Sequence, residues 1–143
     1  MEILNMGKYV VHSTLRPLGT QVMNQTGGHS YLSDEPAVAQ GTDAGPNPVQ
    51  YLLGAVGGCM SVTARQIENE EPDLKIKKFK VDVYGETTRY PDGSSKVTHM
   101  DIKLTGETNL SPEDHNFFMN EVVRKCTVHA SLEGSIPMDI EYL

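Results

Sequence analysis

The sequence predicts an α+β protein organised around one buried helix. Residues 45–64 carry no charged side chain, although 22% of the chain is charged, so this segment is shielded from water on most sides. The regions on either side, residues 8–32 and 74–107, contain short β-branched and alternating segments that are typical of strands. A chain of 143 residues can bury a core of its own, and we expect a single domain over residues 1–143.

The composition excludes several classes of function. A formal net charge of −7 and the lack of any basic run disfavour binding to nucleic acid. Residues 1–6 lack the basic and apolar regions of a signal peptide, so we expect a cytoplasmic protein with reduced thiols. The charge-free segment contains Asn47, Pro48, Gln50, Ser61 and Thr63, which make it too polar for a membrane span. Since only 38% of residues are hydrophobic, oligomerisation would help to complete the core.

The first third of the chain predicts a small antiparallel meander. Residues 8–15 are rich in β-branched and aromatic side chains and predict a strand. Residues 16–19, with Pro17 and Gly19, predict a turn. Two further strands are expected at residues 20–24 and 29–32, and residues 33–45 have no periodicity and are expected to form a loop.

The charge-free segment predicts a long helix. Asn47 is a favourable N-cap and Pro48 suits the first helical position, while Pro72 forbids continuation, so the helix should end near Asn69. Apolar and small residues recur at three- and four-residue steps, at Val49, Leu52, Leu53, Val56, Met60, Thr63, Ala64 and Ile67. Three glycines, Gly54, Gly57 and Gly58, each cost about 1 kcal/mol against alanine in such a helix. We therefore expect another helix or strand to approach this helix closely.

The remaining sequence predicts a hairpin, two helices and a closing strand. Residues 74–89 and 97–107 alternate in hydrophobicity on either side of a turn at residues 91–93. The alternation slips between Ile76 and Phe79, which predicts a bulge. A serine cap and a proline at residues 111–112 begin a helix that extends to residue 125. A second short helix is expected from residue 126 to 132, and a strand from 138 to 143.

Two cysteines are the main candidates for chemistry. Cys126 is expected at the start of a helix, beside Arg124 and Lys125, where helix N–H groups favour a thiolate; the alternative is a capping or core thiol. Cys59, on the charge-free helix, taken by itself is interpreted as a small core residue, since free cysteine is among the most buried residue types. A zinc site built from Cys126, His129 and Cys59 is a further alternative, although no second closely spaced pair of ligands completes it.

Two segments resemble the motifs of a known family. Residues 45–59, Gly-Pro-Asn-Pro-Val-Gln-Tyr-Leu-Leu-Gly-Ala-Val-Gly-Gly-Cys, resemble the first cysteine motif of the OsmC/Ohr family of osmotically inducible and organic-hydroperoxide-resistance proteins. Residues 126–132, Cys-Thr-Val-His-Ala-Ser-Leu, resemble the second, and Asp34-Glu35-Pro36 also fits. The resemblance implies an OsmC-like fold, with antiparallel sheets wrapped around central helices in an intertwined homodimer with its active sites at the subunit interface.

The resemblance also implies a function. Characterised members reduce organic hydroperoxides in the response to oxidative stress. On that pattern Cys59 attacks the peroxide, Cys126 resolves the resulting sulfenic acid as a disulfide, and an external dithiol reduces the pair. Neither a metal nor a cofactor is expected.

This sequence departs from the family's pattern at several positions. In the peroxidase branches an arginine from the N-terminal β region activates the thiolate, and a glutamate ten residues before the first cysteine holds it. Here that position is Val49, with Gln50 as its neighbour, and Arg16 is the only arginine before Cys59. Thr127 replaces the usual proline after the second cysteine.

The resulting prediction is a thiol-dependent peroxidase with Cys59, Cys126, Arg16 and Gln50 at its catalytic site. The alternative is a non-enzymatic member that binds a small apolar or thiol-reactive ligand in the pocket at the dimer interface.

Overall fold

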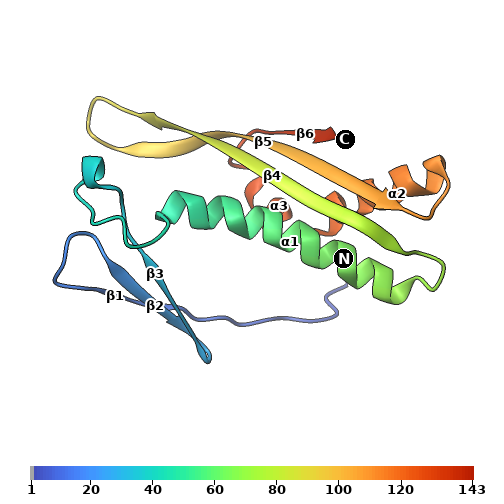
Figure 1. The fold of residues 1–143 in the computed structure, drawn as a ribbon, viewed down its shortest axis with the longest axis horizontal. Helices are drawn as coiled ribbons and strands as arrows, with labels where there is room; N and C mark the ends of the chain where they lie inside the picture. Colours follow the sequence, from blue (N-terminus) through green and yellow to red (C-terminus); the bar gives the residue numbers. More distant parts are fainter. Residues whose placement is uncertain (1) are drawn as a thin grey trace. The chain divides into compact units, whose positions relative to one another are not determined.

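The computed structural model describes residues 2–143, which form two compact units, one ending at Tyr51 and one from Leu52 to Leu143. Among these residues, no helix combines the length and apolar character that crossing a membrane requires. Along the chain the elements are β1 (His12–Leu15), β2 (Val22–Thr26), β3 (His29–Ser33), the 3-10 helix η1 (Ala37–Ala39), α1 (Pro48–Glu70), β4 (Ile76–Arg89), β5 (Ser95–Thr108), α2 (Pro112–Lys125), α3 (Thr127–Leu132) and β6 (Met138–Tyr142) (Figure 1).

The first unit contains the predicted antiparallel meander, in the order β1-β2-β3. The first strand is shorter than expected and begins at His12 instead of residue 8. Its pairing with β2 starts at His12 opposite Gln25, since β2 ends at Thr26 before a turn with Gly27 at φ 56°. Beyond that point the Thr26 hydroxyl donates to the carbonyl of Val10 at 2.8 Å.

A buried carboxylate orders the predicted loop before α1. Asp34 is 1% exposed and accepts hydrogen bonds from the hydroxyls of Thr20 at 2.7 Å and Thr42 at 2.6 Å. It also accepts from the backbone N–H groups of Glu35, Thr42 and Ala44. Burial alone would raise the pKa of Asp34, but these donors outweigh it and hold the pKa well below its usual range. The loop therefore depends on an ionised Asp34.

The long helix α1 begins where the sequence predicts. The side chain of Asn47 accepts from the N–H of Gln50 at 2.8 Å, and the side chain of Gln50 accepts from the N–H of Asn47 at 2.8 Å. This reciprocal arrangement is a capping box. At the other end α1 reaches Glu70, one residue beyond the expected end and two before Pro72.

The second unit contains a mixed sheet in the order β4-β5-β6. The β4–β5 hairpin is antiparallel, and the predicted irregularity is a register shift between Ile76 and Lys78. β6 pairs with β5 in parallel, from Met138 opposite Met100 to Tyr142 opposite Leu104. The expectation of antiparallel sheets is therefore wrong for this pair, because the chain crosses over through α2 and α3 before it returns to the sheet.

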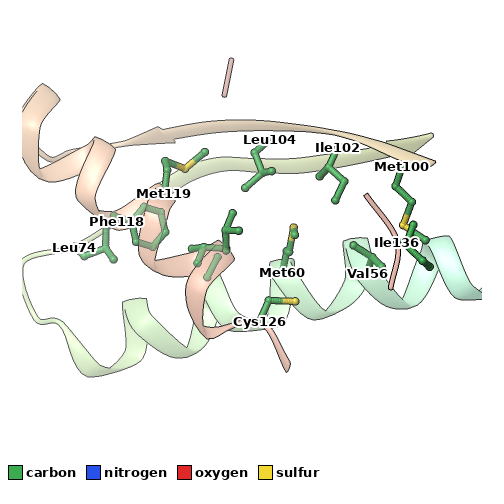
Figure 2. Packing of buried hydrophobic residues seen from close by; sticks show 13 residues of the cluster. Val56, Met60, Leu74, Met100, Ile102, Leu104, Phe118, Met119, Cys126 and Ile136 are labelled. Carbon is green, nitrogen blue, oxygen red and sulfur yellow. The ribbon is translucent and has the colours of Figure 1, made fainter. Parts of the chain in front are cut away.

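The core of the second unit lies between this sheet and the helices. Val56 and Met60 of α1 are fully buried, as are Met100, Ile102 and Leu104 of β5. Figure 2 shows the side chains of β5 pointing toward α1, with Phe118 and Met119 of α2 completing the cluster.

The glycines of α1 differ in their surroundings. A Cβ atom at Gly57 would lie 3.4 Å from Val83 of β4 and 3.8 Å from Val81, so the sheet packs closely here. Within residues 52–143, a Cβ at Gly54 or Gly58 would meet no atom within 4 Å. The predicted close approach thus holds for Gly57 in this chain.

Candidate functional site

The two cysteines, remote in sequence, meet in the second unit. Cys59 lies in the middle of α1 and is half-buried, while Cys126 is fully buried between α2 and α3. Each of the two thiols contributes to the shift in the pKa of the other. Figure 2 shows the Cys126 side chain against α1, near Met60.

The break between α2 and α3 positions Cys126. Its N–H donates to the carbonyl of Val123 at 3.3 Å, and its own carbonyl accepts from Ala130 at 3.0 Å. The backbone at Cys126 is extended, with φ −69° and ψ 113°, so the helix direction changes at this residue. The first N–H groups of α3 have no acceptor within their own helix, and those of Thr127 and Val128 contribute to lowering the pKa of Cys59.

These donors favour the thiolate of Cys59. Burial raises the pKa of this thiol, but the N–H of Val128, the thiol of Cys126, the N–H of Thr127 and the hydroxyl of Thr63 together lower it below its ordinary value. Thr63 lies one turn after Cys59 and is 7% exposed, and its hydroxyl donates to the Cys59 carbonyl at 2.8 Å. Each of these donors is electrically neutral.

Cys126 behaves in the opposite way. Burial raises its pKa to about 11, and the hydrogen bond and charge of Cys59 contribute to this rise. The expectation that the helix start favours a thiolate at Cys126 is therefore wrong, because burial dominates there. Cys59 is the more easily ionised of the two thiols, and Cys126 retains its proton.

The zinc alternative finds no support in this arrangement. His129 is 8% exposed, and its Nδ1 lies 3.8 Å from a carboxylate oxygen of Glu133. Within residues 2–143, the cluster with three convergent metal-binding side chains is His99, Asp101 and Asp139, and it includes neither cysteine.

The His99 cluster is an ion-pair network on the sheet. The Nε2 atom of His99 lies 3.2 Å from an oxygen of Asp101 and 3.2 Å from one of Asp139. The hydrogen bond to Asp101, followed by the negative charges of Asp101, Asp139 and Glu86, raises the pKa of His99 against a smaller effect of burial. Both aspartates are largely exposed.

The other two predicted site residues lie in the first unit. The guanidinium of Arg16 donates to the side-chain oxygen of Gln21 at 3.0 Å. The side chain of Gln50 forms the capping box with Asn47. Their expected catalytic roles stay predictions.

Sequence reasoning did not identify Thr63 or the backbone donors as parts of the site. For Thr63 a signal was available, since residues four apart share one face of a helix. The N–H groups of Thr127 and Val128 are common to nearly all residue types, so the residue types alone gave no indication of them.

The protein has an α+β fold and two free thiols whose pKa values are shifted in opposite directions. This arrangement defines a protein with a dithiol centre. The family model described as "OsmC-like protein" matches residues 41–141. The chain belongs to the OsmC-like family. No curated protein matches it significantly.

Solved structures show the same fold. An OsmC-like protein from Mycoplasma pneumoniae superposes with a TM-score of 0.83 at 19% identity, covering 96% of each chain. An organic hydroperoxide resistance protein OsmC from Legionella pneumophila, also described as a predicted redox protein, gives 0.74 at 11% identity, covering 96% of this chain and 98% of that chain. An organic hydroperoxide resistance protein from Elizabethkingia anophelis, with thiocyanate bound, gives 0.74 at 11% identity, covering 98% of each chain.

Proposed function

We propose that this protein is a thiol-dependent peroxidase that reduces organic hydroperoxides with Cys59 and Cys126. The observation that carries the proposal is the contact between two thiols whose pKa values are shifted in opposite directions. In a peroxidase with two cysteines, the first must ionise readily to attack the peroxide, and the second condenses with the sulfenic acid that forms.

In the first step the Cys59 thiolate attacks one oxygen of the hydroperoxide. The O–O bond breaks, the sulfur is oxidised to a sulfenic acid, and the other oxygen leaves as an alcohol after it takes up a proton. The thiolate supplies the electron pair, so this step needs no cofactor.

In the second step Cys126 attacks the sulfenic acid. A disulfide forms between Cys59 and Cys126, and water leaves with the proton of the Cys126 thiol. An external dithiol then reduces this disulfide by two exchange reactions and becomes a disulfide itself. The starting contact between the two thiols favours this step because little movement is needed to bring the sulfurs together.

Two further features support the proposal. Two of the structural neighbours are described as organic hydroperoxide resistance proteins. In addition, α1 exposes small residues at Gly54, Ala55, Gly58 and Ser61, which would let a second copy approach the Cys59 region. We therefore include a homodimer in the proposal, and light scattering during gel filtration would test it. A cytoplasmic location would keep the cysteines reduced.

Arg16 and Gln50 are proposed as supporting residues of the site. If Arg16 reaches Cys59 in the assembled protein, it would add a positive charge to a set of neutral donors. Arg16→Lys and Arg16→Gln, compared by their peroxidase rates, test that role.

The decisive experiment measures consumption of cumene hydroperoxide with a dithiol reductant. We expect Cys59→Ser to lose the activity and to keep the fold, because the nucleophile is gone. Cys126→Ser is the matched variant: without the dithiol it should consume about one equivalent per site, stop at the sulfenic acid and react with a dimedone probe. If Cys59→Ser consumed the peroxide as fast as wild type, the assignment would be wrong.

Two observations favour a second candidate function. The donors that lower the pKa of Cys59 are all neutral, and Val49 replaces the glutamate of the peroxidase branches. A non-enzymatic member would use the same thiol to hold a small apolar or thiol-reactive ligand. The absence of turnover with every dithiol, together with saturable binding of such a ligand, would favour this function.

A further inference from the structure

We infer that Gln21 is a positioning residue for Arg16: its buried amide holds the guanidinium in one orientation, at the end of a chain of hydrogen bonds that begins at the carboxylate of Asp34. All of these residues lie in the first unit, and the consequence for catalysis rests on the role of Arg16 in the peroxidase proposed above. A different holder is needed here because Val49 stands where the peroxidase branches have the glutamate that holds the arginine.

Three hydrogen bonds between side chains link Arg16 to Asp34. The Nη1 atom of Arg16 donates to Oε1 of Gln21 at 3.0 Å, and Nε2 of Gln21 donates to the hydroxyl of Thr42 at 2.7 Å. That hydroxyl donates to Oδ2 of Asp34 at 2.6 Å. Because Gln21 is 6% exposed and Asp34 is 1% exposed, water competes little for these bonds.

The charge of Asp34 fixes the direction of this chain. The pKa of Asp34 is held well below its usual range, and an ionised carboxylate can only accept hydrogen bonds. Thr42 must therefore give its one hydroxyl proton to Asp34 and accept from Gln21 with its oxygen. Since the NH₂ end of the amide faces Thr42, its oxygen is turned toward Arg16.

The backbone that carries Arg16 and Gln21 is restrained as well. The N–H of Arg16 donates to the carbonyl of Gln21 at 2.9 Å, and the N–H of Gln21 donates to the carbonyl of Leu18 at 3.2 Å. Within this turn Gly19 has φ 55°, and a Cβ atom there would lie 2.8 Å from Cγ2 of Thr42. The turn therefore packs directly on Thr42, which fixes where the guanidinium begins.

A neutral amide holds Arg16 without cancelling its charge. In the part of the chain that the structure describes, none of the ion pairs includes Arg16, and Gln21 accepts only one of the five N–H donors of the guanidinium. A glutamate would also fix the orientation but would offset much of the positive charge. Arg16 can therefore offer an anion such as a thiolate both a fixed direction and its full charge.

NMR spectroscopy measures this orientation without a peroxide. In wild type at low temperature we expect the Nη protons of Arg16 to give separate resonances, because the hydrogen bond to Gln21 slows rotation of the guanidinium. Thr42→Val removes the hydroxyl and should merge these resonances, whereas Thr42→Ser keeps the hydroxyl and should retain them. Thr20→Val is the matched control, since Thr20 donates to the other oxygen of Asp34, outside the chain to Arg16.

Two results would overturn the inference. One is a Thr42→Val variant whose Arg16 resonances match those of wild type. The other is a loss in Thr20→Val as complete as in Thr42→Val, because the orientation would then depend on the loop as a whole. These variants leave Gln21 in place, so the result does not require a folded variant at this buried position.

A double-mutant cycle tests the consequence for the reaction. Gln21→Leu should lower the rate of cumene hydroperoxide reduction about tenfold, since it removes a hydrogen bond to a charged group, and Arg16→Gln should lower it at least as much. If Gln21 acts through Arg16, the double variant should be no slower than Arg16→Gln alone. Losses that multiply in the double variant would contradict the positioning role. A wild-type chain without peroxidase activity would refute the proposed function instead, while the Arg16 resonances would still decide whether Gln21 holds the guanidinium.

Discussion

The thiols of Cys59 and Cys126 shift each other's pKa values in opposite directions, which is the behaviour expected of a dithiol centre. The pKa of Cys59 is lowered, whereas burial and the neighbouring sulfur raise the pKa of Cys126 to about 11. When the pair loses one proton, Cys59 therefore gives it up more readily than Cys126.

This mutual effect predicts how substitutions of Cys126 affect Cys59. Cys126→Ala removes the donor and should raise the pKa of Cys59, slowing its alkylation at neutral pH about tenfold, since a hydrogen bond to a charged group contributes about 1.5 to 3 kcal/mol. Cys126→Ser keeps a hydroxyl donor and should retain most of the wild-type rate. The rate at which iodoacetamide modifies Cys59 measures the effect of each of the two substitutions. Faster alkylation in Cys126→Ala than in Cys126→Ser would contradict the contact.

Thr63 provides a separate test of the thiolate's surroundings. Thr63→Val conserves the shape of the buried side chain but removes the hydroxyl that contributes to lowering the pKa of Cys59. We expect the pKa of Cys59 to rise in this variant and to stay near the wild-type value in Thr63→Ser. The ultraviolet absorbance of the thiolate, followed against pH, reports both values. If the pKa of Cys59 were the same in Thr63→Val and Thr63→Ser, the hydroxyl of Thr63 would have no effect on this thiol.

Gln50 allows capping to be separated from catalysis. Gln50→Ala breaks the capping box with Asn47 and should cost about 1 kcal/mol of stability, measured by urea unfolding. Gln50→Glu can form the same box and should stay close to wild type. If Gln50→Ala lowered the peroxidase rate of the folded protein more than Gln50→Glu did, a role beyond capping would follow.

The His99 cluster predicts a pH-dependent contribution to stability. The hydrogen bond to Asp101 and the charges of Asp101, Asp139 and Glu86 raise the pKa of His99 in the folded state. Since the folded state binds the proton more tightly, the stabilisation is complete below the unfolded pKa of about 6.5 and is lost as pH rises through the folded value.

Urea unfolding across this pH range measures that contribution. In His99→Gln we expect the free energy of unfolding to change less with pH than in wild type. The variant should lose most stability at acidic pH, where His99 is protonated in the wild-type protein. A His99→Gln variant whose stability changes with pH as steeply as wild type would contradict the role of the cluster.

Much of the fold could be predicted from the sequence because its signals are local. The capping residues Asn47 and Pro48 and the stop at Pro72 bracket α1 to within one residue of its observed end. Likewise, the slip between Ile76 and Phe79 corresponds to the register shift at the start of β4.

What sequence reasoning missed depends on contacts between distant segments. The parallel pairing of β6 with β5 follows from the path of the chain through α2 and α3, which no local pattern specifies. No local pattern specifies, either, that Cys59 forms a thiolate more readily than Cys126. The sequence identifies the start of α3, but it does not say that the N–H groups there lower the pKa of a thiol on α1.

The connection between α3 and β6 is short and firmly held. The N–H groups of Glu133, Ser135 and Ile136 donate back to α3 at 2.9 to 3.0 Å, and the carbonyl of Pro137 accepts from Met100 at 3.0 Å. Inserting one residue here would either turn Asp139 and Glu141 toward the core or displace the turn that carries Cys126. The register of β6 on β5 and the position of α3 are thus linked through the length of this connection.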